Sequence, residues 1–504
     1  MSSIKQLAGQ TFWYGISSIA ARFINYLLTP YLTYSSLIST ANYGQMGAIY
    51  AAIPMFNIIF TYGMETTYFR FMRKDHDHDA VNNTATISLL VSSIVLSVLL
   101  WMKQHWLAKI ATLEEFPLLI QLSIIVIGLD ALSTIPFARL RYESRPRLFA
   151  CIKIANILIN IGFTVFFLSY CPAKAKADPG SWAIIVYRPD INPIIYVLLA
   201  NVIASFLTLV FLSKWVFPKK WKFNLQLWLT MMAYSLPMLV AGLGGMVNET
   251  FDRLMLGWWL PSANGYADEQ RGIYNGCYKL SILITLFIQA FRMGAEPFFF
   301  KQAEGDNPQK TYARVMKFFV ITVSAMFLVV VLFMPIWRNF ISPKYWSGLK
   351  VVPVLLLANM CLGIYYNLSI WYKLTNKTMD GAKITLTGTA VTILVNYIFI
   401  PHYSYVASAW ATFLCYFSMM IISYVWGQKA YYVPYPWKKL LAYIGIALLL
   451  FFLHHFITGL FENTGFSLSL GAVFIIAFML FIIKIEKKEF AQFPFVGRLA
   501  KKYF

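Results

Sequence analysis

The feature that most constrains this chain is a succession of long apolar segments separated by short polar ones. Residues 193–213, 439–458 and 466–483 are each predominantly apolar over about 20 residues, the length that an α-helix needs to cross a bilayer. Transmembrane β-strands are shorter and alternate in polarity, and these segments do not alternate. The sequence therefore predicts an all-α, polytopic membrane protein.

Fourteen such segments leave too few of the 504 residues for a sizeable soluble domain. Charged residues make up 12% of the chain, about half of the ~25% found in soluble proteins. This excludes a soluble enzyme and a disordered protein. The expected helices are 10–33, 44–68, 84–102, 116–138, 149–171, 193–213, 229–257, 273–299, 315–336, 351–372, 381–400, 405–427, 439–458 and 466–483.

Lysine and arginine gather on one side of the predicted bundle. When successive loops are assigned alternately to the two sides, the side that holds both termini carries 28 basic residues and the other carries 9. Cytoplasmic loops of membrane proteins are enriched in Lys and Arg. We therefore expect both termini in the cytoplasm. Because the loops account for the net charge of +21, we expect no nucleic-acid partner.

The chain also contains an internal repeat. A shift of 231 residues aligns residues 62–71 (YGMETTYFRF) with residues 293–302 (MGAEPFFFKQ), and the match extends without gaps to residues that rarely coincide by chance. The aligned pairs include Arg22 with Arg253, Gly63 with Gly294, and Glu65 with Glu296.

Six helices separate the start of one copy from the start of the other, so both copies enter the membrane from the same side. Parallel repeats of this kind are typical of transporters with a substrate site between two lobes. We predict an N-terminal lobe in residues 1–224 and a C-terminal lobe in 225–430, each of six helices. Residues 431–504 then hold an appended helix pair and a basic cytoplasmic tail.

Charged side chains inside the predicted helices are candidates for function, because each costs at least ~2.5 kcal/mol to insert at the centre of a bilayer. We consider the cations as candidate phosphate ligands and four of the acids as candidates for ion coupling. The cations are Arg22, Lys153, Arg253, Lys279 and Arg292. The ion-coupling acids are Glu65, Asp130, Glu249 and Glu296.

Several of these residues have structural alternatives. Glu249 and Arg253 are four residues apart, as are Arg292 and Glu296, so each pair shares a helical face and can neutralise itself. Glu65 and Glu296 occupy equivalent repeat positions near predicted cytoplasmic helix ends. That symmetry favours pairing, for instance beside the basic residue five positions further on in each copy.

Other charges are harder to explain by local pairing. Arg22 and Lys279 have no acid three or four residues away, and together they predict a cationic cavity suited to an anion, above all phosphate. Lys153 lies near the predicted cytoplasmic face, where snorkelling is the alternative. Asp130 is the one charged residue in the middle of its predicted helix. It is either an ion-coupling residue or the ion-pair partner of Arg22 or Lys153.

No P-loop, nucleotide fingerprint or nucleophile elbow occurs in the sequence. We therefore predict no cofactor, no metal centre and no covalent catalysis.

The chain resembles the multidrug/oligosaccharidyl-lipid/polysaccharide (MOP) exporter superfamily, and within it the polysaccharide-biosynthesis branch with its Wzx-type flippases. The segments that carry the resemblance are FWYGISSIAARFINYLLTPYL, YGMETTYFRF, IPFARLRYESRPRLF, NETFDRLMLGWWL and GIYNGCYKLSILITLFIQAFRMGAEPFF. It covers most of residues 8–430.

The resemblance implies two six-helix lobes around a central cavity in the bacterial inner membrane. Such flippases move undecaprenyl-pyrophosphate-linked sugars, including lipopolysaccharide precursors, from the inner to the outer leaflet. Cations of helices 1 and 8 are implicated with the pyrophosphate, which here points to Arg22 and to Lys279 or Arg292. In the related lipid II flippases the last two helices form a groove for the lipid tail.

The resemblance leaves an alternative, an ion-coupled multidrug exporter of the same superfamily, in which H⁺ or Na⁺ drives transport. That branch relies on an acid in helix 1, and residues 10–33 contain none. Expected partners are the lipid-linked oligosaccharide, membrane lipid and other proteins of polysaccharide synthesis.

Overall fold

The computed structural model describes residues 20, 23–72, 77–217, 221–303, 305–461 and 463–490. These residues are mostly helical and contain no β-strand. Thirteen of their helical segments are long and apolar enough to cross a bilayer, and each overlaps one of the predicted spans from 44–68 to 466–483. The all-α membrane fold is thereby confirmed, while the first predicted span, 10–33, lies largely outside the described residues.

The described residues form two compact units, one up to residue 279 together with 385–415, the other comprising 280–384 and the residues from 416 onward. The first unit contains α2 (Leu28–Tyr34), α3 (Thr40–Thr61), α4 (Met64–Met72), α5 (His78–Met102), α6 (Gln104–Ala111), α7 (Pro117–Tyr142), α8 (Pro146–Val165), η1 (Phe166–Tyr170), α9 (Cys171–Ala177), α10 (Ala183–Val186), α11 (Ile194–Phe211), α12 (Ser213–Val216), α13 (Leu225–Thr250), α14 (Asp252–Trp259) and η2 (Ala263–Gly265). The second contains α16 (Pro308–Leu332), α17 (Met334–Trp337), η3 (Arg338–Phe340), η4 (Pro343–Val351), α18 (Val352–Leu368), α19 (Ile370–Leu374), α22 (Trp437–Gly459), α23 (Thr464–Ile485) and α24 (Lys487–Phe490). Both units include parts of α15 (Tyr266–Gln302), α20 (Thr378–Tyr403) and α21 (Tyr405–Ala430).

The unit boundaries fall inside these three long helices. They therefore do not coincide with lobes at 1–224 and 225–430, and the lobe boundaries stay a prediction.

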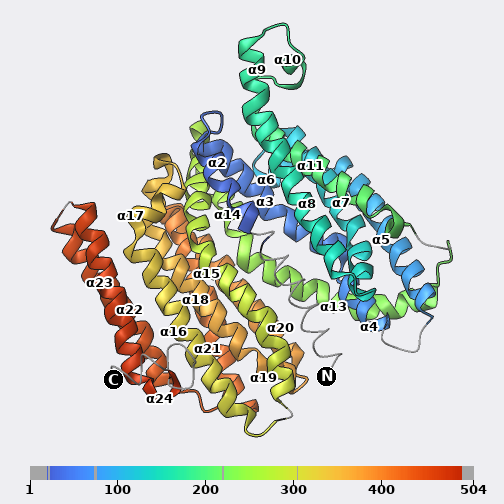
Figure 1. Ribbon diagram of the computed structural model, residues 1–504. Helices are drawn as coiled ribbons and strands as arrows, with labels where there is room; N and C mark the ends of the chain where they lie inside the picture. Colours follow the sequence, from blue (N-terminus) through green and yellow to red (C-terminus); the bar gives the residue numbers. More distant parts are fainter. Residues whose placement is uncertain are drawn as a thin grey trace. The chain divides into compact units, whose positions relative to one another are not determined.

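In the first unit, α7 packs against α3, α5 and α11, and α11 packs in turn on α8 (Figure 1). Proline starts both α7 and α8, where its missing N–H costs no helical hydrogen bond. Ser39 begins α3 with a reciprocal capping box to Asn42. The α8–α9 helix continues to Ala177, and α10 follows, so the predicted connection 172–192 is partly helical.

The second predicted span is broken between α3 and α4. Tyr62 and Gly63 adopt φ values of 35° and 72°, in the left-handed region that favours glycine. A Cβ on Gly63 would also lie 3.1 Å from the carbonyl oxygen of Ser235. The sequence repeat did not predict this break, because α15 runs without interruption through the equivalent Gly294.

The start of α15 packs closely on α3. A Cβ on Gly272 would lie 2.0 Å from the carbonyl oxygen of Thr40, so a larger residue would force the two backbones apart. The sequence had assigned Arg271 to a loop, which is wrong. Arg271 is fully buried in α15 and pairs with Asp268 at 2.8 Å, and that neutralised pair lets the helix start earlier, at Tyr266.

In the second unit, α16 is the most buried of the described membrane-length helices and packs against α18, α22 and α23. The antiparallel pair α22 and α23, coloured red in Figure 1, is thus attached to α16. Lys317 on α16 holds the end of this pair, because its ammonium group contacts Glu486, which follows α23, at 2.6 Å and Glu489 on α24 at 3.2 Å.

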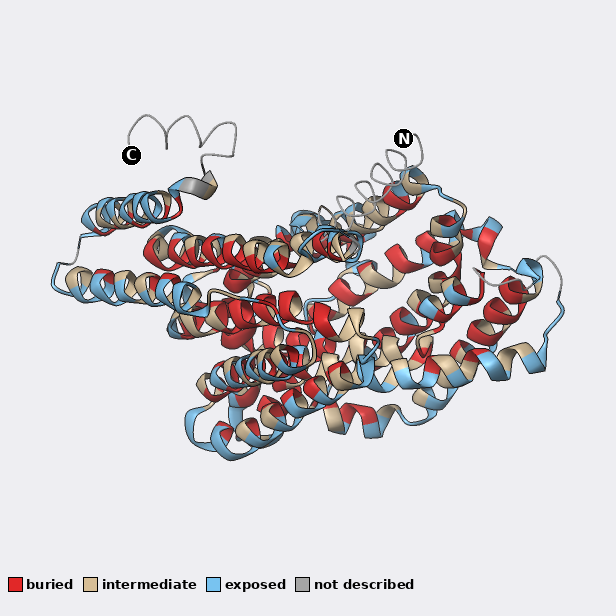
Figure 2. Cartoon of the chain, turned by 90° about the horizontal axis from the view of Figure 1, so that it is seen from below, coloured by how far each residue is buried: buried red, intermediate tan, exposed pale blue. Residues whose placement is uncertain are grey.

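Figure 2 shows buried residues on the helix faces that turn toward other helices and exposed residues on the outward faces. Many outward residues are large and apolar, among them Val98, Phe452, Phe456 and Val473. Outward apolar faces are what a bilayer requires, because hydrocarbon rather than water covers them.

Candidate substrate-binding site

Lys279 lines a polar pocket within the first unit, which we call the Lys279 pocket. Its volume is about 110 Å³. The lining residues are Asn25, Leu28, Thr29, Leu32, Tyr43, Met46, Tyr50, Asn160, Val197, Asn201, Asn275 and Lys279. Lys279 is the one charged side chain among these, and it makes no hydrogen bond or ion pair with any described residue. Arg22, the other predicted unpaired cation, lies outside the described residues.

Asparagine carboxamides give the Lys279 pocket its polarity. Asn201 on α11 donates from Nδ2 to the Tyr50 hydroxyl at 2.6 Å and to the backbone oxygen of Val197 at 2.8 Å. Asn275 lies one helical turn before Lys279, and Gly47 on α3 leaves room for it, because a Cβ there would lie 3.2 Å from its Nδ2.

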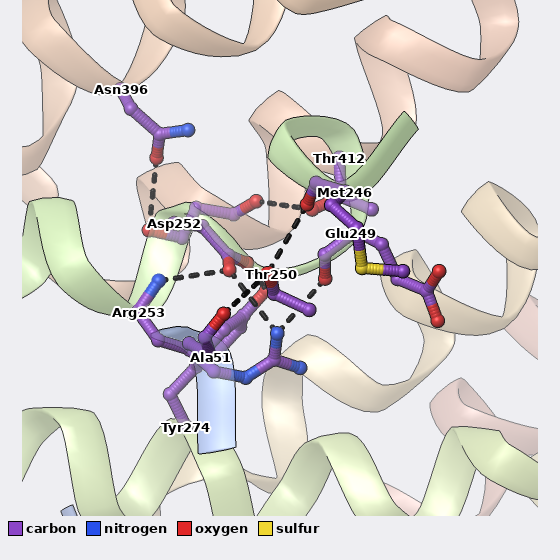
Figure 3. A network of polar contacts seen from close by, with 10 residues as sticks. Ala51, Met246, Glu249, Thr250, Asp252, Arg253, Tyr274, Asn396 and Thr412 are labelled. Carbon is purple, nitrogen blue, oxygen red and sulfur yellow. Dashed lines mark hydrogen bonds and ion pairs between the residues drawn. The ribbon is translucent and has the colours of Figure 1, made fainter. Parts of the chain in front are cut away.

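Arg253 belongs to a buried network rather than to the lining of this pocket (Figure 3). Its Nη1 contacts Asp252 Oδ1 at 3.4 Å and donates to the backbone oxygen of Glu249 at 2.9 Å. Tyr274 donates to the other oxygen of Asp252 at 2.6 Å, and the Tyr278 ring lies 4.3 Å from the guanidinium. Arg253 is thus paired with Asp252.

The alternative that Arg253 is neutralised by the side chain of Glu249 is wrong. Figure 3 shows the Glu249 carboxylate turned away from the guanidinium, and Glu249 is exposed. Arg253 instead pairs with the adjacent Asp252, which is 3% exposed, because a buried guanidinium needs a buried counter-charge.

A second and larger cavity of the first unit, which we call the Asp130 cavity, brings together three other predicted residues. It has a volume of about 440 Å³. Glu65, Asp130 and Lys153 line it, together with Arg141, which the sequence had assigned to a loop. The remaining lining residues are Asn57, Ile58, Thr61, Ser133, Thr134, Phe137, Phe149, Asn156 and Thr208.

The charges of the Asp130 cavity balance. Glu65 forms an ion pair with Arg141. Asp130 accepts a hydrogen bond from Ser205 at 2.8 Å, and the Lys153 ammonium lies 4.1 Å from the centre of the Phe137 ring. Asp130 and Lys153 share the cavity without forming a direct ion pair. Two cations and two carboxylates leave this cavity without net charge.

Arg292 and Glu296 lie in the second unit. Arg292 pairs with Glu296 at 3.4 Å, which confirms the predicted contact along the helix, and its guanidinium lies 4.8 Å from the Tyr366 ring. Glu296 also accepts from Lys373 on α19 at 2.6 Å. Glu65 and Glu296 are thus both paired, but with Arg141 and Lys373 rather than with the basic residue five positions further on.

Sequence reasoning missed the asparagines and Arg141. The asparagines left a signal, since Asn160, Asn201 and Asn275 are amides inside apolar spans, and Asn275 shares a helical face with Lys279. Arg141 left none, because it follows the predicted end of its helix at 138, whereas α7 continues to Tyr142.

The sequence profile described as "polysaccharide biosynthesis protein" matches residues 7–303, more than half of the chain. The chain belongs to the polysaccharide biosynthesis protein family. The predicted membership of this branch of the MOP superfamily is confirmed. A comparison with curated protein sequences gave no match.

Solved structures of two related transporter types share the fold. A lipid II flippase MurJ in an inward closed conformation superposes with a TM-score of 0.67 at 14% identity, covering 94% of this chain and 98% of its own. An inward-facing MATE multidrug transporter of the MOP superfamily gives 0.59 at 12%, covering 83% and 94%. A eukaryotic MATE transporter gives 0.52 at 12%, covering 87% and 96%.

Proposed function

We propose that this protein is a flippase that moves a lipid-linked oligosaccharide, an undecaprenyl-pyrophosphate sugar, from the inner to the outer leaflet by alternating access. Lipopolysaccharide precursors belong to this substrate class. The membrane is the bacterial inner membrane, with both termini in the cytoplasm. The protein transports without covalent chemistry, and other proteins of polysaccharide synthesis associate with it.

The observation that carries the proposal is the charge of the Lys279 pocket. Its described lining holds one cation and no carboxylate, in contrast to the balanced Asp130 cavity. A lone ammonium group in a membrane-spanning helix is costly unless an anion accompanies it. Arg292 is already paired with Glu296, so we assign the pyrophosphate contact on α15 to Lys279, with Arg22 as its predicted companion.

The proposed mechanism separates the parts of the substrate. Lys279 and Arg22 neutralise the pyrophosphate, which lowers the cost of removing it from water. The sugars occupy the hydrated cavity between the two predicted lobes, and the polyprenyl tail stays in the lipid. The helices α22 and α23, which pack on α16, offer that tail an outer surface.

The Asp130 cavity is the proposed place of ion coupling. Asp130 has one oxygen bonded to Ser205, and protonating it or binding Na⁺ there would leave the charge of Lys153 uncompensated, because Arg141 stays paired with Glu65. The cavity would then attract an anion more strongly. A membrane potential contributes ~2.3 kcal/mol per unit charge and 100 mV.

The alternative is an ion-coupled exporter of drugs or other small molecules, and the shared MATE fold favours it. Lipophilic cations are the substrates that separate the two functions, since Lys279 would repel them. Export of such cations from cells that express the protein would support the exporter.

The test is flipping of a fluorescent undecaprenyl-pyrophosphate sugar in proteoliposomes. We expect Lys279→Ala to reduce the rate at least tenfold without lowering the melting temperature, and Arg22→Ala with Lys279→Ala to abolish flipping. Lys103→Ala, at an exposed lysine between α5 and α6, is the matched control and should flip normally. Full activity of the double variant would contradict the proposal.

A further inference from the structure

The Lys279 pocket contains a hydrogen-bond acceptor whose orientation is fixed. Asn201 Nδ2 donates to the backbone oxygen of Val197 at 2.8 Å, and a backbone carbonyl can only accept. The nitrogen of this carboxamide is therefore identified by its partner, and its second hydrogen reaches the Tyr50 hydroxyl. Only the oxygen of Asn201 remains for a ligand, and it needs a donor.

A second acceptor in the pocket has the same need. Asn160 on α8 is 9% exposed, and its Oδ1 is buried with no partner among the described residues. A buried acceptor left without a donor is destabilising, so a ligand that donates a hydrogen bond to Asn160 Oδ1 would gain binding energy. Asn201 and Asn160 come from neighbouring helices, α11 and α8, which pack on each other.

A pyrophosphate cannot satisfy these oxygens. Ionised phosphate oxygens accept hydrogen bonds, so they suit the ammonium of Lys279 but not the oxygens of Asn160 and Asn201. Sugar hydroxyl and acetamido N–H groups are donors. Lys279 and the asparagines thus select different parts of one molecule.

We propose that the Lys279 pocket recognises the junction between a pyrophosphate and its first sugar, with Lys279 on the phosphate and the oxygens of Asn160 and Asn201 accepting from the sugar. This inference rests on the proposed function and adds the part of the substrate that sets specificity. A volume of about 110 Å³ equals three or four waters at about 30 Å³ each. The pocket is therefore large enough only for the few atoms next to the phosphate–sugar linkage, and the rest of the pyrophosphate and of the oligosaccharide lies outside it.

The test compares two lipids that differ only in the sugar, farnesyl pyrophosphate and farnesyl-pyrophosphate-linked N-acetylglucosamine, bound to the full-length protein in nanodiscs. We expect wild type to bind the sugar-bearing lipid at least tenfold more tightly. Asn160→Leu and Asn201→Leu should each remove most of that preference and leave the affinity for farnesyl pyrophosphate unchanged. Lys279→Met should weaken the binding of both lipids.

The matched control is Asn83→Leu on α5. Asn83 is also a buried asparagine of the first unit with an unpartnered Oδ1, but it does not line the pocket. It should keep the full preference for the sugar-bearing lipid. Melting temperatures of all variants, measured without either farnesyl lipid, identify any variant that fails to fold. If Asn160→Leu fails to fold, Asn160→Ser replaces it.

The outcomes separate the inference from the proposed function. If wild type binds both lipids equally, or if the asparagine variants lose both lipids in parallel, the inference is overturned and the flippase stands. If wild type binds neither lipid, both are overturned. A uridine-diphosphate sugar has the same junction without the tail. If it displaces the farnesyl lipid at equal concentration, the pocket chemistry is supported and the lipid-linked substrate is not.

Discussion

At the scale of single residues, three lysines in this chain show how surroundings decide what a cation inside the helical bundle does. Lys317 is 8% exposed and contacts the carboxylates of Glu486 and Glu489, so its charge is used for structure. Lys153 shares a cavity with two acids and one arginine. Lys279 lines a pocket that holds no described acid, and only there is the charge available to an anionic ligand.

The ion cluster at Glu486 predicts how stability depends on pH. Burial raises the pKa of Glu486, but hydrogen bonds from Lys317, Tyr443 and Lys439 outweigh it, so the pKa lies below its usual 4.5. A carboxyl group whose pKa is lower in the folded protein than in the unfolded chain stabilises the fold at pH values above its unfolded pKa. This stabilisation is lost as the pH falls through the pKa of the folded state. We therefore expect the melting temperature to decrease once the pH is lowered beneath about 4.5.

The comparison with Glu486→Gln isolates this effect. At pH 7 the variant should unfold at a lower temperature than wild type, and its free energy of unfolding should be smaller by about 1–3 kcal/mol. This difference in stability should disappear as the pH falls. Glu114→Gln, at an exposed position, should match wild type throughout. A gap of constant size from pH 7 to pH 3 would show that the charge of Glu486 is not the cause.

At the scale of elements, the two copies of the repeat keep an ion pair but differ in helix continuity. Glu65 pairs with Arg141 at the end of α7, and Glu296 pairs with Lys373 on α19. Lys373 is one residue away from the position that the 231-residue shift gives for Arg141. Yet the chain breaks at Gly63 and continues as one helix through Gly294.

This difference predicts opposite effects of one substitution at two equivalent positions. Gly63→Ala should destabilise the protein by about 1–2 kcal/mol, because a left-handed backbone is costly for alanine and its Cβ would meet Ser235. Gly294→Ala should be neutral or stabilise by up to about 1 kcal/mol, since nothing lies within 4 Å of an added Cβ. Thermal unfolding of both variants in detergent measures this, and equal losses would refute the assignment.

At the scale of the whole molecule, the distribution of lysine and arginine predicts the orientation in the membrane. The side with both termini carries 28 basic residues against 9, and basic loops stay in the cytoplasm. We expect alkaline phosphatase fused after residue 504 to be inactive and a green fluorescent protein there to fluoresce. A phosphatase inserted in 178–182, on the opposite side, should be active, and the reverse pattern would invert the predicted topology.

The class of fold and the approximate helix spans within the described residues were predictable from the sequence, because apolar length and loop charge are local properties of each segment. The family was predictable from the resemblance of short segments. The sequence also identified charged residues inside the spans, although it placed Arg141 and Arg271 in loops. Only the tertiary structure decided how those charges are used. Asp252 rather than Glu249 faces Arg253, Arg141 reaches Glu65 from a distant segment, and asparagines from α8, α11 and α15 meet around Lys279. Such contacts depend on which helices pack together and where each helix breaks or ends, and side-chain spacing along one helix does not contain that information.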